Sequence, residues 1–246
     1  AEFAIRPFLI RYEKETLKIL SQWVMDENEH VRRLVSEGTR PRLPWAMRLP
    51  SFITNPKPTL KLLEKLKDDP SEYVRRSVAN HLNDITKDNP DLALDVLAQW
   101  AKGASKERLW IIRHALRSLV KQGHPQALAI LGFEPPKVGI TKFDAKTPVV
   151  KFGEALLFQF ELASKAQKQQ HLVIDYVVHF VKANGSTSPK VFKMSTRSLD
   201  AGDVVVLDRK HAIRPITTRT YYGGTHRVEV QVNGQVLGGG DFELEM

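Results

Sequence analysis

The chain has 246 residues, of which 42% are hydrophobic and 26% charged, and a globular protein of this length usually has two domains. It contains no cysteine, which excludes disulfides and thiolate metal sites, and no apolar run approaches the ~20 residues that a membrane-spanning helix needs. The formal net charge of +9 favours a polyanionic partner, nucleic acid first.

The opening residues repeat a pattern found further along the chain. The segment E-F-A-I-R-P-F-L, Glu2–Leu9, resembles E-G-T-R-P-R-L, Glu37–Leu43, because each has a glutamate, then Arg-Pro, then an apolar residue two positions later. The first residue is Ala rather than Met. We therefore expect that the chain begins at the end of a repeat and that further helices precede it in the natural protein.

A hydrophobic period of 3.6 residues predicts helices throughout the first half of the chain. The segment Asp69-Pro70-Ser71-Glu72 predicts a helix start, with an acidic cap and proline at the first helical position. Five prolines interrupt residues 40–58, and an ordered connection of that length is usually functional. The predicted helices cover residues 14–24, 29–39, 59–67 and 70–87, then one begins at Pro90, one runs from Ser105 to Gln122, and one covers 125–133.

Two of these helices share a Val-Arg-Arg start, at Val31 and at Val74, and such recurrence indicates a helical solenoid. At 100° per residue, each helix has an apolar face that should pack and a second face that we expect to be exposed. The packed faces hold Val31, Leu34, Val35 and Gly38 in one copy and Val74, Val78, His81 and Ile85 in the other. The exposed faces hold Arg33, Glu37 and Arg40, and Arg76, Asn80 and Asp84.

After Glu134-Pro135-Pro136 the hydrophobic period changes from 3.6 to 2, which predicts strands. Asn233-Gly234 is a strong signal for a two-residue hairpin. About seven short strands over a hundred residues fit an immunoglobulin-like β-sandwich, although the Cys…Trp…Cys pattern is absent and another small sandwich is possible. The predicted fold class is therefore multidomain, α then β, with an α-helical HEAT-like solenoid over residues 1–134 and an immunoglobulin-like β-sandwich over 137–246.

Three segments together carry a family resemblance: E-F-A-I-R-P-F, S-E-G-T-R-P-R-L-P-W and S-E-Y-V-R-R-S-V-A-N-H-L-N-D-I. They resemble the AlkC branch of bacterial DNA alkylation-repair enzymes, which are HEAT-like-repeat DNA glycosylases related to AlkD. The resemblance covers about residues 1–133, and some members of the branch carry an immunoglobulin-like domain at the C-terminus.

The resemblance implies excision of cationic N-alkylated bases, such as 3-methyladenine and 3-methylcytosine, without flipping the base into a closed pocket. The partner would be double-stranded DNA containing alkylated bases, and we expect a monomeric, cytoplasmic bacterial enzyme that needs no cofactor. The acidic residues of the family's active site match Glu2, Glu37 and Asp84, and its lesion-side aromatic residue matches Trp45.

Carboxylates fit the chemistry of breaking an N-glycosidic bond, because positive charge develops on the sugar and a pre-placed carboxylate stabilises it. A surface that binds phosphates should otherwise avoid acidic residues. The alternative for Glu37 is a salt bridge to Arg33 and Arg40, and for Asp84 a helix-end position near Lys87. Trp45 could instead be a buried anchor of its loop.

The candidate DNA-binding residues are basic side chains whose alternative is a solvated polar helix face: Arg33, Arg40, Arg42, Arg76, Arg113 and His114. The eight histidines show no metal-ligand spacing, so we predict no metal.

Two competing functions come from other classes. One is a non-catalytic HEAT-repeat scaffold that binds DNA or protein, since fold alone does not give function. The other makes the β-domain a module that binds protein or carbohydrate. Within the glycosylase interpretation, we expect the β-domain to add affinity for DNA but no chemistry.

Overall fold

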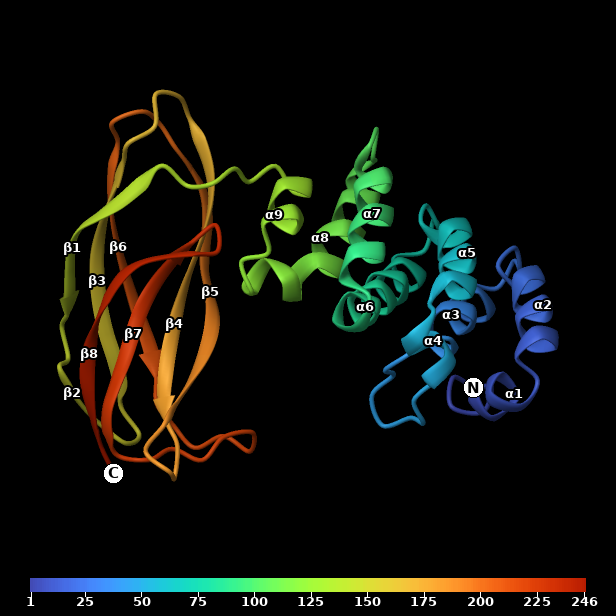
Figure 1. Cartoon of the computed structure of the whole chain (residues 1–246), viewed down its shortest axis with the longest axis horizontal. Helices are drawn as coiled ribbons and strands as arrows, with labels where there is room; N and C mark the ends of the chain where they lie inside the picture. Colours follow the sequence, from blue (N-terminus) through green and yellow to red (C-terminus); the bar gives the residue numbers. More distant parts are fainter. The chain divides into compact units, whose positions relative to one another are not determined.

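The computed structural model describes all 246 residues, and the chain divides into two compact units, Ala1–Leu119 and Val120–Met246. The first is entirely helical and the second is mostly strand (Figure 1). This order of an α-helical region and then a β-rich region is the one predicted from the sequence. No helix combines the length and the hydrophobicity that crossing a bilayer requires.

Apolar residues at helical spacing form the core of the first unit, and Leu20, Leu63, Val78 and Leu94 are almost completely buried there. Helix α6 packs against α3, α5 and α7, so it is a central helix of this unit. The helices are α1 (Arg6–Arg11), α2 (Glu13–Trp23), α3 (Glu29–Gly38), α4 (Pro50–Thr54), α5 (Lys57–Leu66), α6 (Glu72–Asp88), α7 (Pro90–Ala101), α8 (Lys106–Lys121) and α9 (Pro125–Ile130).

The predicted start of α6 is wrong by two residues. The helix begins at Glu72 with Ser71 before it, so neither Asp69 nor Pro70 belongs to its first turn. The Asp69 carboxylate instead accepts hydrogen bonds from the Arg32 guanidinium at 2.7 and 3.0 Å and from the Ser71 amide at 2.9 Å. An ion pair with Arg32 of α3 therefore takes the side chain that the sequence suggested as a cap.

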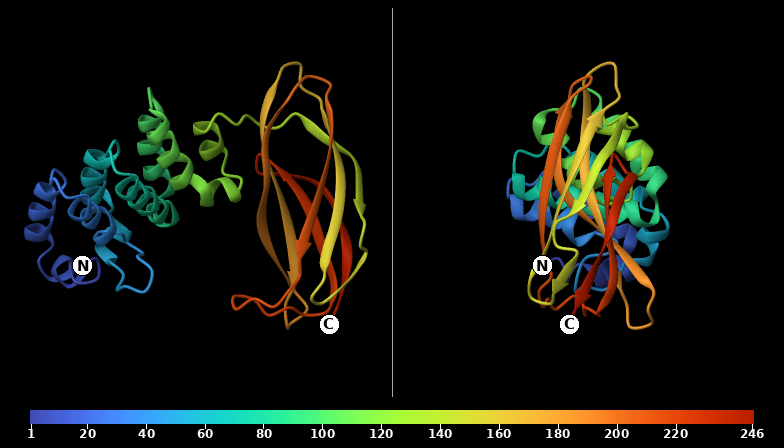
Figure 2. Two further views of the ribbon diagram at one scale, coloured as in Figure 1. Left: turned by 180° about the vertical axis from the view of Figure 1, so that it is seen from behind. Right: turned by 90° about the vertical axis from the view of Figure 1, so that its left-hand side faces the viewer.

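The second unit contains two sheets packed face to face (Figure 2). The strand order is β1-β3-β6 in one sheet and β2-β8-β7-β4-β5 in the other, and every pairing is antiparallel except that of β2 with β8. The strands are β1 (Val138–Ala145), β2 (Val149–Lys151), β3 (Ala155–Ser164), β4 (Gln170–Val181), β5 (Thr187–Leu199), β6 (Val204–Ala212), β7 (Gly224–Val232) and β8 (Gln235–Glu245).

The alternating residues of β3, β4 and β7 form the core between the sheets, as the two-residue period predicts. Asn233 and Gly234 connect β7 to β8 with φ values of 42° and 80°, which confirms the predicted hairpin. The Gly234 backbone lies so close to Gly123 that a Cβ atom there would come within 2.2 Å of the Gly123 Cα atom. The hairpin turn is therefore packed against the segment that follows α8, within the second unit.

Candidate active site: a buried carboxylate–arginine cluster

Arg40 joins two of the predicted site residues. Its Nε donates to Asp84 Oδ2 at 2.8 Å, and its Nη1 donates to Glu37 Oε1 at 2.8 Å. Glu37 lies in the last turn of α3, Asp84 lies in the last part of α6, and Arg40 begins the proline-rich connection after α3. Glu37 and Asp84 therefore lie close together, since both contact one guanidinium.

The prediction that these three side chains lie on an exposed helix face is wrong. Glu37, Arg40 and Asp84 are 7%, 8% and 2% exposed. Residues of a helix that faces both a neighbouring helix and a covering loop are buried on more than one side, and α3 packs against α6 directly beside the Arg40 connection. A buried carboxylate is tolerated only when its oxygens are paired, which explains the dense set of contacts around both carboxylates.

Each carboxylate also has a second partner. Glu37 Oε2 accepts a hydrogen bond from Ser77 Oγ at 2.7 Å, and Asp84 Oδ1 lies 3.0 Å from Lys87 Nζ. Burial lowers the pKa of Arg40, but the hydrogen bond that it donates to Asp84 and the charges of Asp84 and Glu37 outweigh burial and raise the pKa. Arg40 is thus a fixed cation at the centre of the cluster.

Arg6 is a member of this site that the sequence did not identify. It is completely buried, and its guanidinium donates to the carbonyl oxygens of Gly38 (2.9 Å), Arg40 (2.8 Å) and Met47 (2.6 Å). Burial, followed by the charge of Arg40, lowers its pKa to about 10. Arg6 therefore connects α1 to the end of α3 and to the loop that carries Trp45. The Arg-Pro dipeptide that the segments Glu2–Leu9 and Glu37–Leu43 share was the one feature of the sequence that could have drawn attention to Arg6.

Glu2 and Arg33 form an ion pair at the edge of the cluster. Arg33 Nη1 contacts Glu2 Oε1, and Arg33 Nη2 lies 3.7 Å from Glu37 Oε1. A hydrogen bond within its own residue and the one from Arg33 lower the pKa of Glu2 to about 2. The Arg33 guanidinium also lies 4.5 Å from the centre of the Tyr73 ring. The salt bridges suggested for Glu37 are therefore present, and Glu2 is close to Glu37 through Arg33.

Trp45 is 99% exposed and has φ of 64°. The interpretation of Trp45 as a buried loop anchor is therefore wrong. A tryptophan in the left-handed region is unusual, and strain of this kind costs about 1–3 kcal/mol and is concentrated at functional sites. The loop holds the indole in solvent although a buried position would be more favourable.

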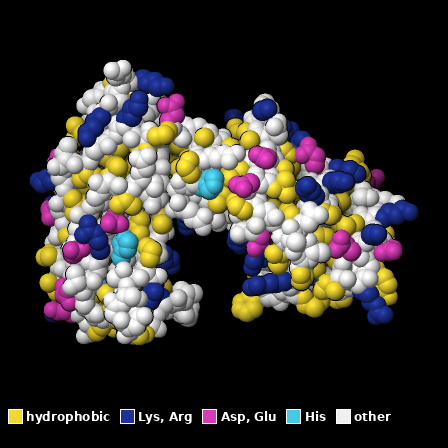
Figure 3. Space-filling model, in the orientation of Figure 1, with side chains coloured by type: hydrophobic (Ala, Val, Ile, Leu, Met, Phe, Trp, Pro, Cys, Tyr) yellow, Lys and Arg dark blue, Asp and Glu magenta, His cyan; other side chains and the backbone are white.

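The remaining candidate DNA-binding residues lie outside the cluster. Arg42 forms a two-bond ion pair with Asp88 at 2.6 and 2.5 Å, and the exposed Arg76 pairs with Glu72 at 2.6 Å. His114 Nε2 lies 3.1 Å from Asn80 Oδ1, and its ring stacks on Trp110 at 5.0 Å. Arg113 is exposed on α8. On the face shown in Figure 3, basic side chains of both units are mixed with acidic ones rather than gathered in one patch.

His81 lies beneath the cluster. It is completely buried, and burial lowers its pKa to about 4, so the ring is neutral at pH 7. Its Nδ1 is 2.9 Å from the Ser36 carbonyl oxygen and donates to it, since that oxygen can only accept. Its Nε2 has no partner. No group of three or more His, Asp or Glu side chains is arranged to hold a metal ion.

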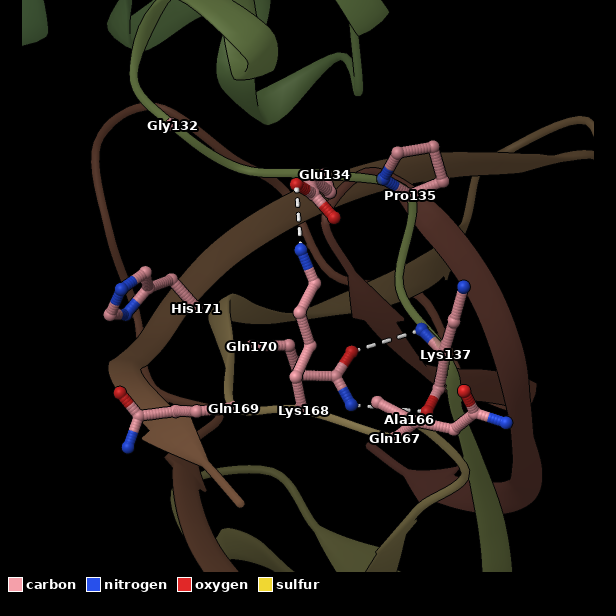
Figure 4. A pocket seen from close by; sticks show the side chains of 10 residues that line it. All are labelled: Gly132, Glu134, Pro135, Lys137, Ala166, Gln167, Lys168, Gln169, Gln170 and His171. Atoms are coloured by element: carbon pink, nitrogen blue, oxygen red, sulfur yellow. Dashed lines mark hydrogen bonds and ion pairs between the residues drawn. The ribbon is translucent and has the colours of Figure 1, made fainter. Parts of the chain in front are cut away.

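A cavity of about 590 Å³ lies in the second unit, between residues 132–137 and the β3–β4 connection (Figure 4). Its lining includes a Lys168–Glu134 ion pair at 3.6 Å. It also includes Gln170, whose side-chain amide accepts a hydrogen bond from the Lys137 backbone N–H and donates one to the Lys137 carbonyl oxygen. These contacts hold the chain before β1 against the loop before β4, and the cavity contains no pair of carboxylates.

Both halves of the chain match known proteins. Residues 1–119 match the family model for DNA alkylation repair enzymes, and residues 139–246 match the model for the C-terminal Ig-like domain of the uncharacterised protein YhaZ. The chain is 40% identical over 245 residues to the uncharacterized protein YhaZ of Bacillus subtilis (strain 168), covering 99% of this chain and 68% of that protein.

Among solved structures, the chain is similar to that of Pseudomonas fluorescens alkylpurine DNA glycosylase AlkC bound to DNA containing an abasic site analog. The TM-score is 0.97 at 46% identity, covering 100% of this chain and 68% of that one.

Proposed function

Since this chain belongs to the AlkC family of DNA alkylation repair enzymes, we propose that it is a DNA glycosylase that removes cationic N-alkylated bases, 3-methyladenine and 3-methylcytosine among them. The partner is double-stranded DNA that contains such a base, and the enzyme acts as a monomer. The helical unit is the HEAT-like part, in which α3 and α6 are the repeated Val-Arg-Arg helices.

The reaction breaks the bond between C1′ of the deoxyribose and the ring nitrogen of the base. The electron pair of that bond goes to the base, which leaves as a neutral molecule because it was already cationic. Positive charge develops on the sugar, water adds at C1′, and the water proton passes to a carboxylate or to solvent. The protein therefore needs to stabilise a cation and orient a water, and it needs no strong general acid.

The observation that carries this proposal is the pair of buried carboxylates, Glu37 and Asp84, held by one guanidinium. Two carboxylates fixed beside each other at low exposure present negative charge without having to reorganise, which is the arrangement that stabilises a developing cation. Arg40 is the positioning residue of this pair. Arg40 is buried, and we therefore assign it the positioning of the two carboxylates in place of the phosphate contact expected from the sequence.

Trp45 and Glu2 complete the site. The exposed indole offers an aromatic face to a cationic base that stays near the DNA stack, an interaction worth about 1–2 kcal/mol. Glu2 stays ionised at pH 7 because its pKa is about 2. Because the base does not enter a closed pocket, the group that approaches the carboxylates is the sugar.

Arg33, Arg76, Arg113 and His114 are the basic side chains of the helical unit that we propose as contacts to the DNA backbone. Arg76 and Arg113 are exposed, and Arg33 and His114 are partly buried. Arg42 can join them only if it leaves Asp88.

The direct test is release of free base from defined duplexes. The chain should release 3-methyladenine and 3-methylcytosine, which are cationic in DNA, and should leave the neutral base hypoxanthine in place. A non-catalytic scaffold would bind all three duplexes and release no base from any of them.

A further inference from the structure

Asp84 has one buried partner and one exposed partner. Its Oδ2 is bound to Arg40, which is buried and is also bound to Glu37. Its Oδ1 is bound to the ammonium group of Lys87, whose side chain is 47% exposed, whereas that of Asp84 is 2% exposed. Lys87 therefore lies between solvent and Asp84 Oδ1, the oxygen of this carboxylate that Arg40 does not bind.

Only Lys87 can leave this carboxylate at low cost. Arg40 would have to abandon two charge-assisted hydrogen bonds at once in a buried position. The ammonium group of Lys87 is on a flexible stem and is strongly hydrated, so water replaces Asp84 as its partner. The Lys87 end of this pair lies in solvent, so its departure costs less than that of the buried Arg40.

Formal charge shows why the exchange matters. Three carboxylates of the site, Glu2, Glu37 and Asp84, are ion-paired to three side-chain cations, Arg33, Arg40 and Lys87. With Lys87 in place these paired charges cancel, and Asp84 offers no free oxygen to a cationic substrate. With Lys87 withdrawn, the three carboxylates face two guanidinium groups, and Asp84 Oδ1 is open to a new cation.

We propose that Lys87 is a displaceable counterion that occupies the place of the substrate's positive charge, so that a cationic sugar or base binds by exchanging with its ammonium group. This inference rests on the proposed function, because it assumes that Asp84 faces the reacting sugar. It makes Lys87 a specificity-determining residue. When Lys87 leaves, the buried Asp84 carboxylate loses an ion pair, and only a cationic substrate can restore one.

The competing explanation is an ordinary pair at i,i+3 spacing on a helix surface. The chain provides a matched control, since Lys67 pairs with Glu64 at the same spacing near the end of α5, outside the site. A lysine whose loss matters only for general stability or for phosphate attraction should behave as Lys67 does.

The experiment measures the affinity of the full chain for two duplexes with an abasic analogue at the same position, one a cationic pyrrolidine and one a neutral tetrahydrofuran. The informative quantity is the ratio of the two affinities, because a lost phosphate contact weakens both duplexes equally and cancels. The wild type should prefer the cationic duplex. Lys87→Gln should raise this ratio by about two- to fivefold, the range expected for an ion pair whose ammonium group is in solvent. Lys87→Arg and Lys67→Gln should leave it at the wild-type value.

The counterion role and the proposed function can be refuted separately. A wild-type preference for the cationic duplex that Lys87→Gln leaves unchanged would refute the counterion role alone. A ratio of one in the wild type and in Lys87→Gln alike would refute the electrostatic basis of the proposed function, and the counterion role with it. A ratio that rises equally in Lys67→Gln would show a general effect of removing one positive charge and would also overturn the inference.

Discussion

Asp84→Asn separates catalysis from structure at the centre of the site. Asparagine has nearly the size of aspartate and can still accept the hydrogen bond from Arg40 Nε, but it carries no charge. If Asp84 stabilises the cationic sugar, the variant should bind damaged DNA as well as the wild type or better, because a charge that repels phosphate is gone. It should then fail in the chemical step.

Coulomb's law sets the expected size of the loss. For a unit charge about 5 Å from the carboxylate in a medium of effective dielectric constant about 20, Coulomb's law gives about 3 kcal/mol. At about 1.4 kcal/mol per factor of ten, the rate of excision should fall by roughly 10²–10³-fold. Removing one partner of a buried ion pair also destabilises the fold, by up to about 3–5 kcal/mol, so thermal unfolding must confirm that the variant is folded at the assay temperature.

The assay is single-turnover excision of 3-methyladenine at saturating protein, measured beside binding affinity. Asp88→Asn is the matched control, because Asp88 follows on the same helix and is ion-paired to Arg42 outside the cluster. Its excision rate should stay within about threefold of the wild type. If Asp84→Asn is folded, less stable, and excises at a near-normal rate, Asp84 is a structural ion-pair residue and the catalytic assignment is wrong.

Three further predictions concern other parts of the chain. Trp45→Ala should leave the melting temperature unchanged, since the indole is fully exposed, and should slow excision by about five- to thirtyfold in the same assay. The pKa of His81 is about 4 in the folded chain, below its unfolded value. The free energy of unfolding should therefore fall by up to about 3 kcal/mol as pH drops from 6.5 to 4, and urea titrations of His81→Gln should show a smaller fall. Burial raises the pKa of Asp175 to about 6, so its ionisation opposes folding as pH rises from 4 to 6; Asp175→Asn should therefore unfold at a higher temperature than the wild type at pH 7.5.

Local sequence signals predicted the elements well where one side of each element is buried. The apolar residues Ile112, Leu116 and Leu119 of α8 are buried, and the alternating residues of β3 fill the space between the sheets. Prolines and helix-capping residues gave most helix starts, because those signals act within one turn of the chain.

The burial of the site could not be predicted, because it depends on contacts between distant segments. A helical wheel places Glu37 opposite Val35 correctly, but it contains no information about the Arg40 connection that returns over α3 and α6. The same limit concealed Arg6, whose three acceptors lie more than thirty residues away in the sequence. An arginine next to a proline suggests nothing about burial until its partners are known.

The resemblance of three segments to the AlkC branch pointed to Glu2, Glu37, Asp84 and Trp45, which periodicity alone would have left as surface residues. The structure adds what those segments do not contain, namely that a single buried guanidinium sets the positions of two of the carboxylates. Variation at Arg40 should therefore affect both carboxylates together.

The most direct test of the account is the release of free 3-methyladenine from a methylated duplex, detected by mass spectrometry, for the wild type and for the double variant Glu37→Gln/Asp84→Asn. The wild type should convert the duplex to an abasic site and free base, and the folded double variant should bind the same duplex without releasing base. Equal release by the two proteins, or binding without release by the wild type, would contradict the claim that the buried carboxylates carry out this chemistry.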